Sequence, residues 1–212
     1  MMVKIKWTFL IISIIGITIL FIRSSANHVT SIRDFQAWFN KPENGFIKKR
    51  NVNGLEFSVQ YRPPELMLIN EIKREEALTL HMIDSLSNLY GDSDYFLLTI
   101  RPDPENFDPQ GDLIKSRVEN YSQYSEAIKY LSFYLDENIE LLVGEDTLVP
   151  NFYHYERGFE VSNKQSFLVS FPRTDNSSQS KKFIFDDFVF YSGRLKFNFN
   201  NNQNYPEIRE II

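Results

Sequence analysis

Apolar and polar residues alternate clearly in one part of the chain, which is the pattern of a half-buried β-strand. Residues 55–61 read LEFSVQY, so Leu55 and every second residue after it can face the same side of a sheet. The Asn53-Gly54 pair before this run suits the positive φ angles of a two-residue hairpin turn. The stretch FIKKRNVNGLEFSVQY therefore predicts a β-hairpin, and YFLLTI at residues 95–100 predicts a further, buried strand.

Between the hairpin and this strand the apolar residues recur at helical spacing. The spacing holds over residues 65–91, where Gly91 can end a helix, so we expect one long helix. The loop that follows YFLLTI is rich in proline and acidic residues. After it a second helix is expected over residues 112–119, with Asp112 as its N-cap.

From about Tyr130 onwards the pattern returns to a period of two. Strands are expected in YLSFYLD, NIELLVG, SFLVSF, FIFDDFVF and RLKFNF, and NFYHYERGFEV reads as a strand with a bulge or turn at its glycine. Short strands separated by polar turns are typical of a sandwich or barrel. The sequence thus predicts an α+β fold, in which the hairpin and two helices pack on a C-terminal antiparallel sheet or β-sandwich.

The start of the chain is uniformly apolar. Sixteen uncharged residues run from Trp7 to Ile22, and a helix of that length covers about 24 Å of a hydrocarbon layer about 30 Å thick. Counting from Val3 gives twenty residues and the full depth, if the flanking lysines extend to the headgroups. A retained transmembrane helix would place these side chains in the bilayer: Trp7, Ile11, Ile14, Ile15, Ile19 and Ile22.

A cleaved signal peptide is the alternative for this leader. Lys4 and Lys6 precede the apolar run, and Ser24 and Ala26 follow it in an A-x-A-like pattern. Retention is favoured because the run exceeds the usual ~7–15 residues and Arg23 separates it from the cleavage site. The expected location is the inner membrane, single-pass, with the C-terminal domain in the periplasm, or secretion after cleavage near Ala26.

These segments give the expected organisation of the chain. Residues 1–26 form a signal anchor or signal peptide, residues 27–46 a connector, residues 47–199 an exported α+β domain and residues 200–212 an Asn-rich tail. The connector contains NHVTSIRDFQAWF, which is expected to form a short amphipathic helix.

Composition excludes several kinds of chemistry. The chain has no cysteine, so disulfides, zinc–thiolate sites, iron–sulfur clusters and thiol nucleophiles are absent. The first 31 residues hold three of the 23 basic residues and no acidic one, which leaves 20 basic against 28 acidic residues and a net charge of −8 for the remainder. Basic runs such as those at 48–50 and 181–182 are short, and no phosphate-binding Gly-rich loop is present, so neither nucleic acid nor a cofactor is expected.

Four polar residues are weak candidates for catalysis. His154 and Glu156 lie in FYHYER, where they could form a polar cluster in a cleft, and Asp186 and Asp187 lie in FIFDDFVF. Paired carboxylates can perform acid–base chemistry. Adjacent strand residues face opposite sides of a sheet, however, so a bulge or a turn explains the aspartate pair more simply.

The acidic loop is a weak candidate for a metal site. Clustered oxygen ligands suit hard cations such as calcium. The EF-hand spacing is absent, and two prolines make the run resemble an ordinary surface loop. The residues concerned are Asp103, Glu105, Asp108 and Asp112.

Tyrosine is concentrated in two stretches, ENYSQYSEAIKYLSFYL and NFYHYE. Exposed tyrosines favour contacts with sugars or with partner proteins, and buried ones contribute to a core. Both interpretations fit the sequence.

Three stretches resemble uncharacterised, membrane-tethered or exported envelope proteins of Bacteroidetes-type bacteria. They are VNGLEFSVQYRPPELM, LLVGEDTLVPNFYHYERGFE and FDDFVFYSGRLKFNF. The similarity lies in the spacing of strands and turns and extends over residues 47–199. The resemblance implies a location in the bacterial envelope. It implies no activity and assigns no catalytic residues.

The expected function is therefore binding or assembly. We expect a domain held at the membrane by its N-terminal helix, which contacts another envelope protein. Two alternatives remain open: a hydrolase of envelope polymers that uses carboxylates, and an immunity or inhibitor protein whose acidic domain binds a basic toxin.

Overall fold

The computed structural model describes residues 31–72, 80–103, 105, 111–156, 163–174, 179–200 and 205–206. The chain divides into two compact units, residues 1–35 with 205–212, and residues 36–204. The account below concerns the second unit. Helix α2 (Ile32–Phe39) begins in the first unit and ends in the second.

Five strands of the second unit form one antiparallel sheet in the order β1-β2-β3-β7-β6. Its members are β1 (Ile47–Val52), β2 (Leu55–Arg62), β3 (Ser93–Pro102), β7 (Gln165–Pro172) and β6 (Phe152–Glu156). The predicted hairpin is confirmed, with Val52 opposite Leu55 in register. Its turn residues Asn53 and Gly54 have φ angles of 52° and 73°, the left-handed conformation that this pair of residues tolerates.

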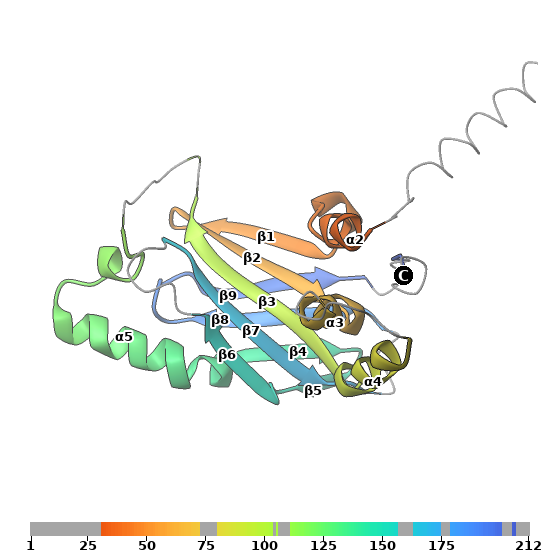
Figure 1. Ribbon diagram of the computed structural model, residues 1–212. Helices are drawn as coiled ribbons and strands as arrows, with labels where there is room; N and C mark the ends of the chain where they lie inside the picture. The colour runs from red at the N-terminus through yellow and green to blue at the C-terminus, as the bar shows by residue number, and fades with distance from the viewer. Residues whose placement is uncertain are drawn as a thin grey trace, which may run out of the picture. The chain divides into compact units, whose positions relative to one another are not determined.

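Four strands form a second antiparallel sheet in the order β5-β4-β8-β9. They are β5 (Asp146–Leu148), β4 (Ile139–Val143), β8 (Lys181–Asp187) and β9 (Gly193–Phe199). The two sheets face each other (Figure 1). Aromatic rings from both sheets form the core between them. Phe96 of the first sheet lies 5.3 Å from Phe183 of the second between ring centroids, and Phe57 lies 6.3 Å from Phe185.

Helices cover the ends of this sandwich. Helices α3 (Pro64–Ile72) and α4 (Leu80–Gly91) lie at one end, and α5 (Tyr121–Phe133) lies at the other (Figure 1). Short 3₁₀ turns, η1 (Pro42–Asn44), η2 (Lys115–Arg117) and η3 (Leu135–Asn138), connect the elements. The predicted α+β class is therefore confirmed as four described helices and two antiparallel sheets.

The hairpin does not stay apart from the later strands, as the order along the sequence suggested. Strand β2 pairs with β3, and β3 pairs with β7, so strands from both halves of the chain share one sheet. Burial explains this arrangement, because Phe57, Phe96 and Phe167 are each fully buried on the inner face.

The predicted strand YLSFYLD is wrong. Helix α5 occupies residues Tyr121–Phe133, and η3 follows it. Leu131 and Leu135 are buried, but Phe133 between them is 72% exposed, whereas strand alternation required all three on one face. A spacing of four residues fits one face of a helix equally well.

The two predicted helices also differ in extent. The described part of the stretch 65–91 forms α3 and α4, with residues 73–79 outside the description. The helix predicted over 112–119 is reduced to the 3₁₀ turn η2. Asp112 still accepts hydrogen bonds from the backbone N–H groups of Ile114 (2.8 Å) and Lys115 (3.3 Å), but the full helix starts only after Asn120.

The membrane-facing residues predicted in the leader, from Trp7 to Ile22, lie outside the described residues. Within the described ranges, no helix has the length and apolar character needed to cross a bilayer.

Candidate functional site

A groove of about 460 Å³ lies between α5 with its preceding turn and the connection from β8 to β9. This is the aromatic groove. It is lined by Arg117, Val118, Glu119, Gln123, Glu126, Ala127, Tyr130, Phe188, Val189 and Tyr191.

The helical wall of the aromatic groove is fixed by local capping. The side chain of Asn120 accepts a hydrogen bond from the Gln123 N–H (3.0 Å), and the Gln123 side chain accepts one from the Glu119 N–H (2.7 Å). The first bond satisfies an N–H group that the first turn of a helix leaves without a partner, and the second joins that turn to the residue before the cap. The side chains of the first turn of α5 are thereby held in place beside the groove.

The opposite wall is held by Asp187, at the end of β8. Its carboxylate accepts hydrogen bonds from the backbone N–H groups of Val189 and Phe190 (both 3.0 Å) and of Ser192 (2.8 Å). The chain leaves the strand here, and Tyr191 takes a positive φ of 58°. Phe188 and Tyr191 are consequently 62% and 79% exposed beside a rigid turn.

Asn53 of the β1–β2 turn connects both walls. Its side-chain amide donates to the carbonyl of Tyr191 (3.0 Å), and its own carbonyl accepts from the Arg117 guanidinium (3.0 Å). The hairpin turn predicted from the sequence thus also positions the aromatic groove.

Tyr130 of α5 is among the residues that line the aromatic groove. Burial and then the negative charge of Asp187 raise the pKa of Tyr130 to about 12. The Tyr130 hydroxyl accepts a hydrogen bond from the Asn138 side chain (2.7 Å). Glu119 and Glu126 also line the groove, so its acidic side chains outnumber Arg117.

Further aromatic side chains are exposed along α5. Tyr121 is 82% exposed, Phe133 72% and Tyr134 42%. Lys129 lies over the Tyr134 ring at 5.8 Å from its centroid. The ring of Tyr134, which directly follows α5, therefore already contacts a cationic side chain of the same chain.

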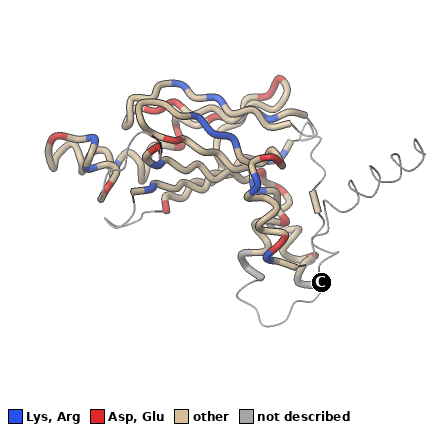
Figure 2. The backbone as a smooth tube through the Cα atoms, turned by 90° about the horizontal axis from the view of Figure 1, so that it is seen from above, with Lys and Arg blue, Asp and Glu red and all other residues tan. Residues whose placement is uncertain are grey.

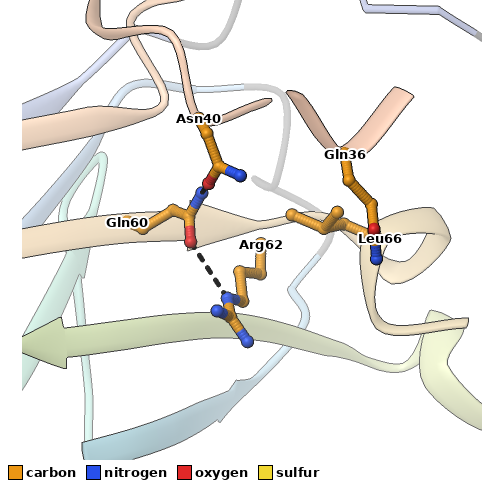
Figure 3. Close-up of a pocket in the computed structure, with 5 residues that line it drawn as sticks. All are labelled: Gln36, Asn40, Gln60, Arg62 and Leu66. Atoms are coloured by element: carbon orange, nitrogen blue, oxygen red, sulfur yellow. Dashed lines mark hydrogen bonds between the residues drawn. The ribbon is translucent and has the colours of Figure 1, made fainter. Parts of the chain in front are cut away.

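A second, smaller cavity of about 180 Å³ lies between α2, β2 and α3. This is the Arg62 cavity, and Figure 3 shows its lining residues: Gln36, Asn40, Gln60, Arg62 and Leu66. The Arg62 Nε donates to Gln60 Oε1 (3.1 Å), while Gln60 Nε2 donates to Asn40 Oδ1 (3.1 Å) and to the carbonyl of Phe39 (3.3 Å). Burial lowers the pKa of Arg62, and the negative charge of Glu156 opposes this effect.

A buried ionic cluster joins the two sheets. Asp94 at the start of β3 is 1% exposed and accepts a hydrogen bond from the Tyr61 hydroxyl (2.8 Å). Its carboxylate lies 3.4 Å from Lys181 Nζ and 3.6 Å from the Arg173 guanidinium. Burial lowers the pKa of Lys181, whereas the Asp94 carboxylate opposes this shift. The side chain of Lys181 is only 5% exposed, so the cluster is structural rather than accessible to a substrate.

The four catalytic candidates from the sequence lie on two different sheets. His154 and Glu156 are exposed on β6, where His154 stacks on Phe152 with ring centroids 6.5 Å apart. Asp186 and Asp187 end β8; Asp186 forms an ion pair with Arg194 (3.0 Å), and Asp187 holds the turn. The structure therefore pairs His154 with Glu156 on one face, and neither aspartate lines the two cavities described above.

The acidic loop is partly described. Asp103 accepts hydrogen bonds from the Asn51 side chain and the Glu105 N–H (both 3.1 Å). Asp112 accepts one from the Tyr124 hydroxyl (2.8 Å), and Asp108 lies outside the described residues. Among the residues that the structure describes, no three His, Asp or Glu side chains are grouped as a metal site would require.

Sequence reasoning missed Arg62 and the aromatic groove. Arg62 is the last residue of β2, and its cavity depends on residues from two helices that no local pattern connects to it. The start of α5 did leave a signal, because Asn120 and Gln123 have the spacing of a capping box.

Comparison with known proteins shows little similarity. No protein-family model matches this chain, and no curated protein does so either. One similar solved structure is the crystal structure of a DUF4426 family protein from Pseudomonas aeruginosa, with a TM-score of 0.36 and 7% sequence identity. The alignment covers 76% of this chain and 97% of that protein, a likeness too remote to assign this chain to a family.

Proposed function

We propose that this chain is a binding or assembly protein of the bacterial envelope. In this proposal its N-terminal helix holds it in the inner membrane, its α+β domain lies in the periplasm, and the aromatic groove contacts another protein. The location is supported by the uncharged run from Trp7 to Ile22 and by the basic residues that precede it.

The exposure of Phe188 and Tyr191 carries the binding part of the proposal. Large aromatic side chains left in water on a rigid turn are typical of protein-binding surfaces, where Tyr and Phe are enriched. Both turn and helix are fixed by hydrogen bonds before any partner arrives, so binding would cost little conformational entropy.

The chemistry of the groove favours a partner segment that presents a Lys or Arg side chain. Glu119 and Glu126 supply negative charge. The charge of Asp187 adds to the rise in the pKa of Tyr130 that burial causes. Aromatic faces attract cations that lie within about 6 Å of the ring centroid. Basic and acidic residues are interspersed along the described chain (Figure 2), so the selectivity would come from this local set and not from one large charged face.

The test uses site-specific photo-crosslinking of the full chain in membranes of its native host. A photoreactive residue replaces Phe188 in the groove, and Phe152 is the matched control because it is 51% exposed on β6, away from the groove. We expect a crosslinked protein at position 188 only, with the crosslink mapped to a segment containing Lys or Arg.

Charge reversal sharpens this experiment. Glu126→Lys should reduce the crosslink at position 188 by roughly tenfold or more, and Tyr191→Ala should do the same. Circular dichroism would show that both variants remain folded. Equal products at positions 188 and 152, or an unchanged yield in Glu126→Lys, would contradict the binding role of the groove. Full-length protein in the soluble fraction would contradict the location alone.

A further inference from the structure

The guanidinium of Arg62 is only partly used by the fold. Its Nε donates to Gln60 Oε1, but within the described residues no carboxylate lies at ion-pair distance from it. Arginine stays charged in proteins, and a partly buried charge that forms no ion pair is unfavourable; the charge of Glu156 acts on Arg62 without forming one. The two terminal amines of this side chain are therefore available to an anion.

The rest of the cavity lining suits such an anion. Gln36, Asn40 and Gln60 contribute side-chain amides, and no acidic residue lines the cavity. Asn40 Oδ1 is occupied by Gln60 Nε2, so the amide nitrogen of Asn40 is the group left to donate. Figure 3 shows these polar side chains with Arg62; Gln36 comes from α2, Asn40 directly follows that helix, and Gln60 and Arg62 come from β2.

Size and shape restrict the ligand. The cavity of about 180 Å³ is slightly larger than one of ~150 Å³ that holds a benzene-sized molecule. The planar fork of a guanidinium matches the two oxygens of a carboxylate. Leu66, which is 7% exposed, offers an apolar wall to a short hydrocarbon group.

We propose that the Arg62 cavity binds a small carboxylate, with Arg62 as its counter-ion, Asn40 as a second donor and Leu66 against its hydrocarbon part. The carboxylate can belong to a free organic acid or to the C-terminus of a peptide. This site is independent of the aromatic groove, so the failure of one proposal leaves the other standing.

Glu156 of β6 is the acidic residue whose charge opposes the lowering of the Arg62 pKa by burial. Its negative charge acts on the Arg62 guanidinium, although β6 is separated from β2 by β3 and β7. A bound carboxylate would meet the same charge and be repelled by it. Neutralising Glu156 should therefore strengthen binding, which is the opposite direction from the loss expected when the cavity itself is damaged.

The experiment titrates isobutyrate into the full chain in detergent micelles. Selective ¹⁵N labelling of arginine reports the Nε–H of Arg62, and ligand-observed NMR reports isobutyrate. We expect a saturable shift of the Arg62 signal with a dissociation constant below roughly 100 mM. Affinity this weak is what a ligand of about six heavy atoms can provide. N-acetyl-Ala-Val with a free C-terminus is the peptide arm, and its tighter or weaker binding relative to isobutyrate identifies the source of the carboxylate.

Variants test the role of each group. Arg62→Met and Asn40→Asp should each weaken isobutyrate binding at least tenfold, the second by placing a negative charge in the lining while keeping the acceptor for Gln60. Glu156→Gln should strengthen it. Arg101→Met is the matched control, because Arg101 is paired with Glu56 (2.8 Å) outside the cavity.

Four results would overturn the proposal. They are no saturable shift in the folded wild type, an equal shift with the neutral isobutyramide, unchanged binding in Asn40→Asp, and sulfate binding as tight as isobutyrate. The first three contradict an anion site, and the last contradicts its assignment to carboxylates. Asn40→Asp changes no buried apolar contact, so the test remains decisive if Arg62→Met fails to fold.

Discussion

Replacing Asp94 by asparagine should destabilise the domain strongly, because it removes the carboxylate charge that lies beside the buried ammonium group of Lys181. Lys181 Nζ lies 3.4 Å from the Asp94 carboxylate, and the two side chains are 5% and 2% exposed. At this distance Coulomb's law with an effective dielectric constant of about 20 gives roughly 5 kcal/mol. Breaking a buried pair by removing one partner costs about 3–5 kcal/mol, which agrees with this figure.

The loss in the free energy of unfolding should depend on pH, and the titration of Lys181 decides whether it grows or shrinks as the pH rises. Burial lowers the pKa of Lys181 in the folded state below its ordinary value of 10.5. Between the two values the unfolded chain binds more protons, so stability rises with pH. The Asp94 carboxylate opposes the lowering of the Lys181 pKa by burial. Asp94→Asn removes that charge, so the pKa of Lys181 in the folded state falls further. The stability of the variant therefore begins to rise at a lower pH than that of the wild type. The difference between wild type and variant should therefore be largest near neutral pH and shrink towards pH 10.5.

Urea denaturation of the full chain in mild detergent, followed by circular dichroism, measures this difference. The double variant Asp94→Asn, Lys181→Met should recover most of the lost stability, because an uncharged side chain then replaces the stranded ammonium group. Glu140→Gln is the control: it breaks a pair with Arg194 whose side chains are 40% and 49% exposed, so it should cost less than about 1 kcal/mol. A loss below about 1 kcal/mol in Asp94→Asn, or a double variant as unstable as the single one, would refute the reasoning.

Two further changes test the core and the turn. Phe96→Ala should lower the free energy of unfolding by about 3–5 kcal/mol, since its ring packs between both sheets, whereas Phe188→Ala, at a side chain 62% exposed, should change it by about 0.5 kcal/mol at most. Equal losses in urea denaturation would contradict the sandwich core. Asp187→Ala should cost about 3 kcal/mol, because three backbone N–H groups lose a charged acceptor, and Asp187→Asn should cost less because it keeps one acceptor oxygen. Asp186→Ala, at a partly exposed ion pair, serves as its control, and a loss as large as that of Asp187→Ala would show that Asp187 does not hold the turn.

Local features of the sequence predicted the elements whose conformation depends on neighbouring residues alone. Asn53 and Gly54 adopt the positive φ angles of the hairpin turn because these two residue types tolerate them. The alternation in LEFSVQY and YFLLTI predicted β2 and β3, since side chains on successive strand residues point to opposite faces.

Where local patterns were ambiguous, tertiary packing chose between them. Leu131 and Leu135 fit a strand of period two and one face of a helix equally well. The cap at Asn120 and the space beside β6 favour the helix, which leaves Phe133 in water. In FIFDDFVF the alternation fits one strand and the aspartate pair favours a bulge or a turn; in the structure Asp187 binds the backbone after it, and β8 ends there.

Both candidate sites depend on residues distant in the sequence. The aromatic groove needs Asn53, Arg117 and Tyr191 together, and the Arg62 cavity needs α2, β2 and α3. The sequence by itself determined the apolar leader, the hairpin turn, most strands and the absence of thiol chemistry, because each follows from residue type and spacing. Only the tertiary structure decided how strands divide between two sheets and which polar groups meet, because burial of the shared aromatic core selects one pairing among many that local patterns allow.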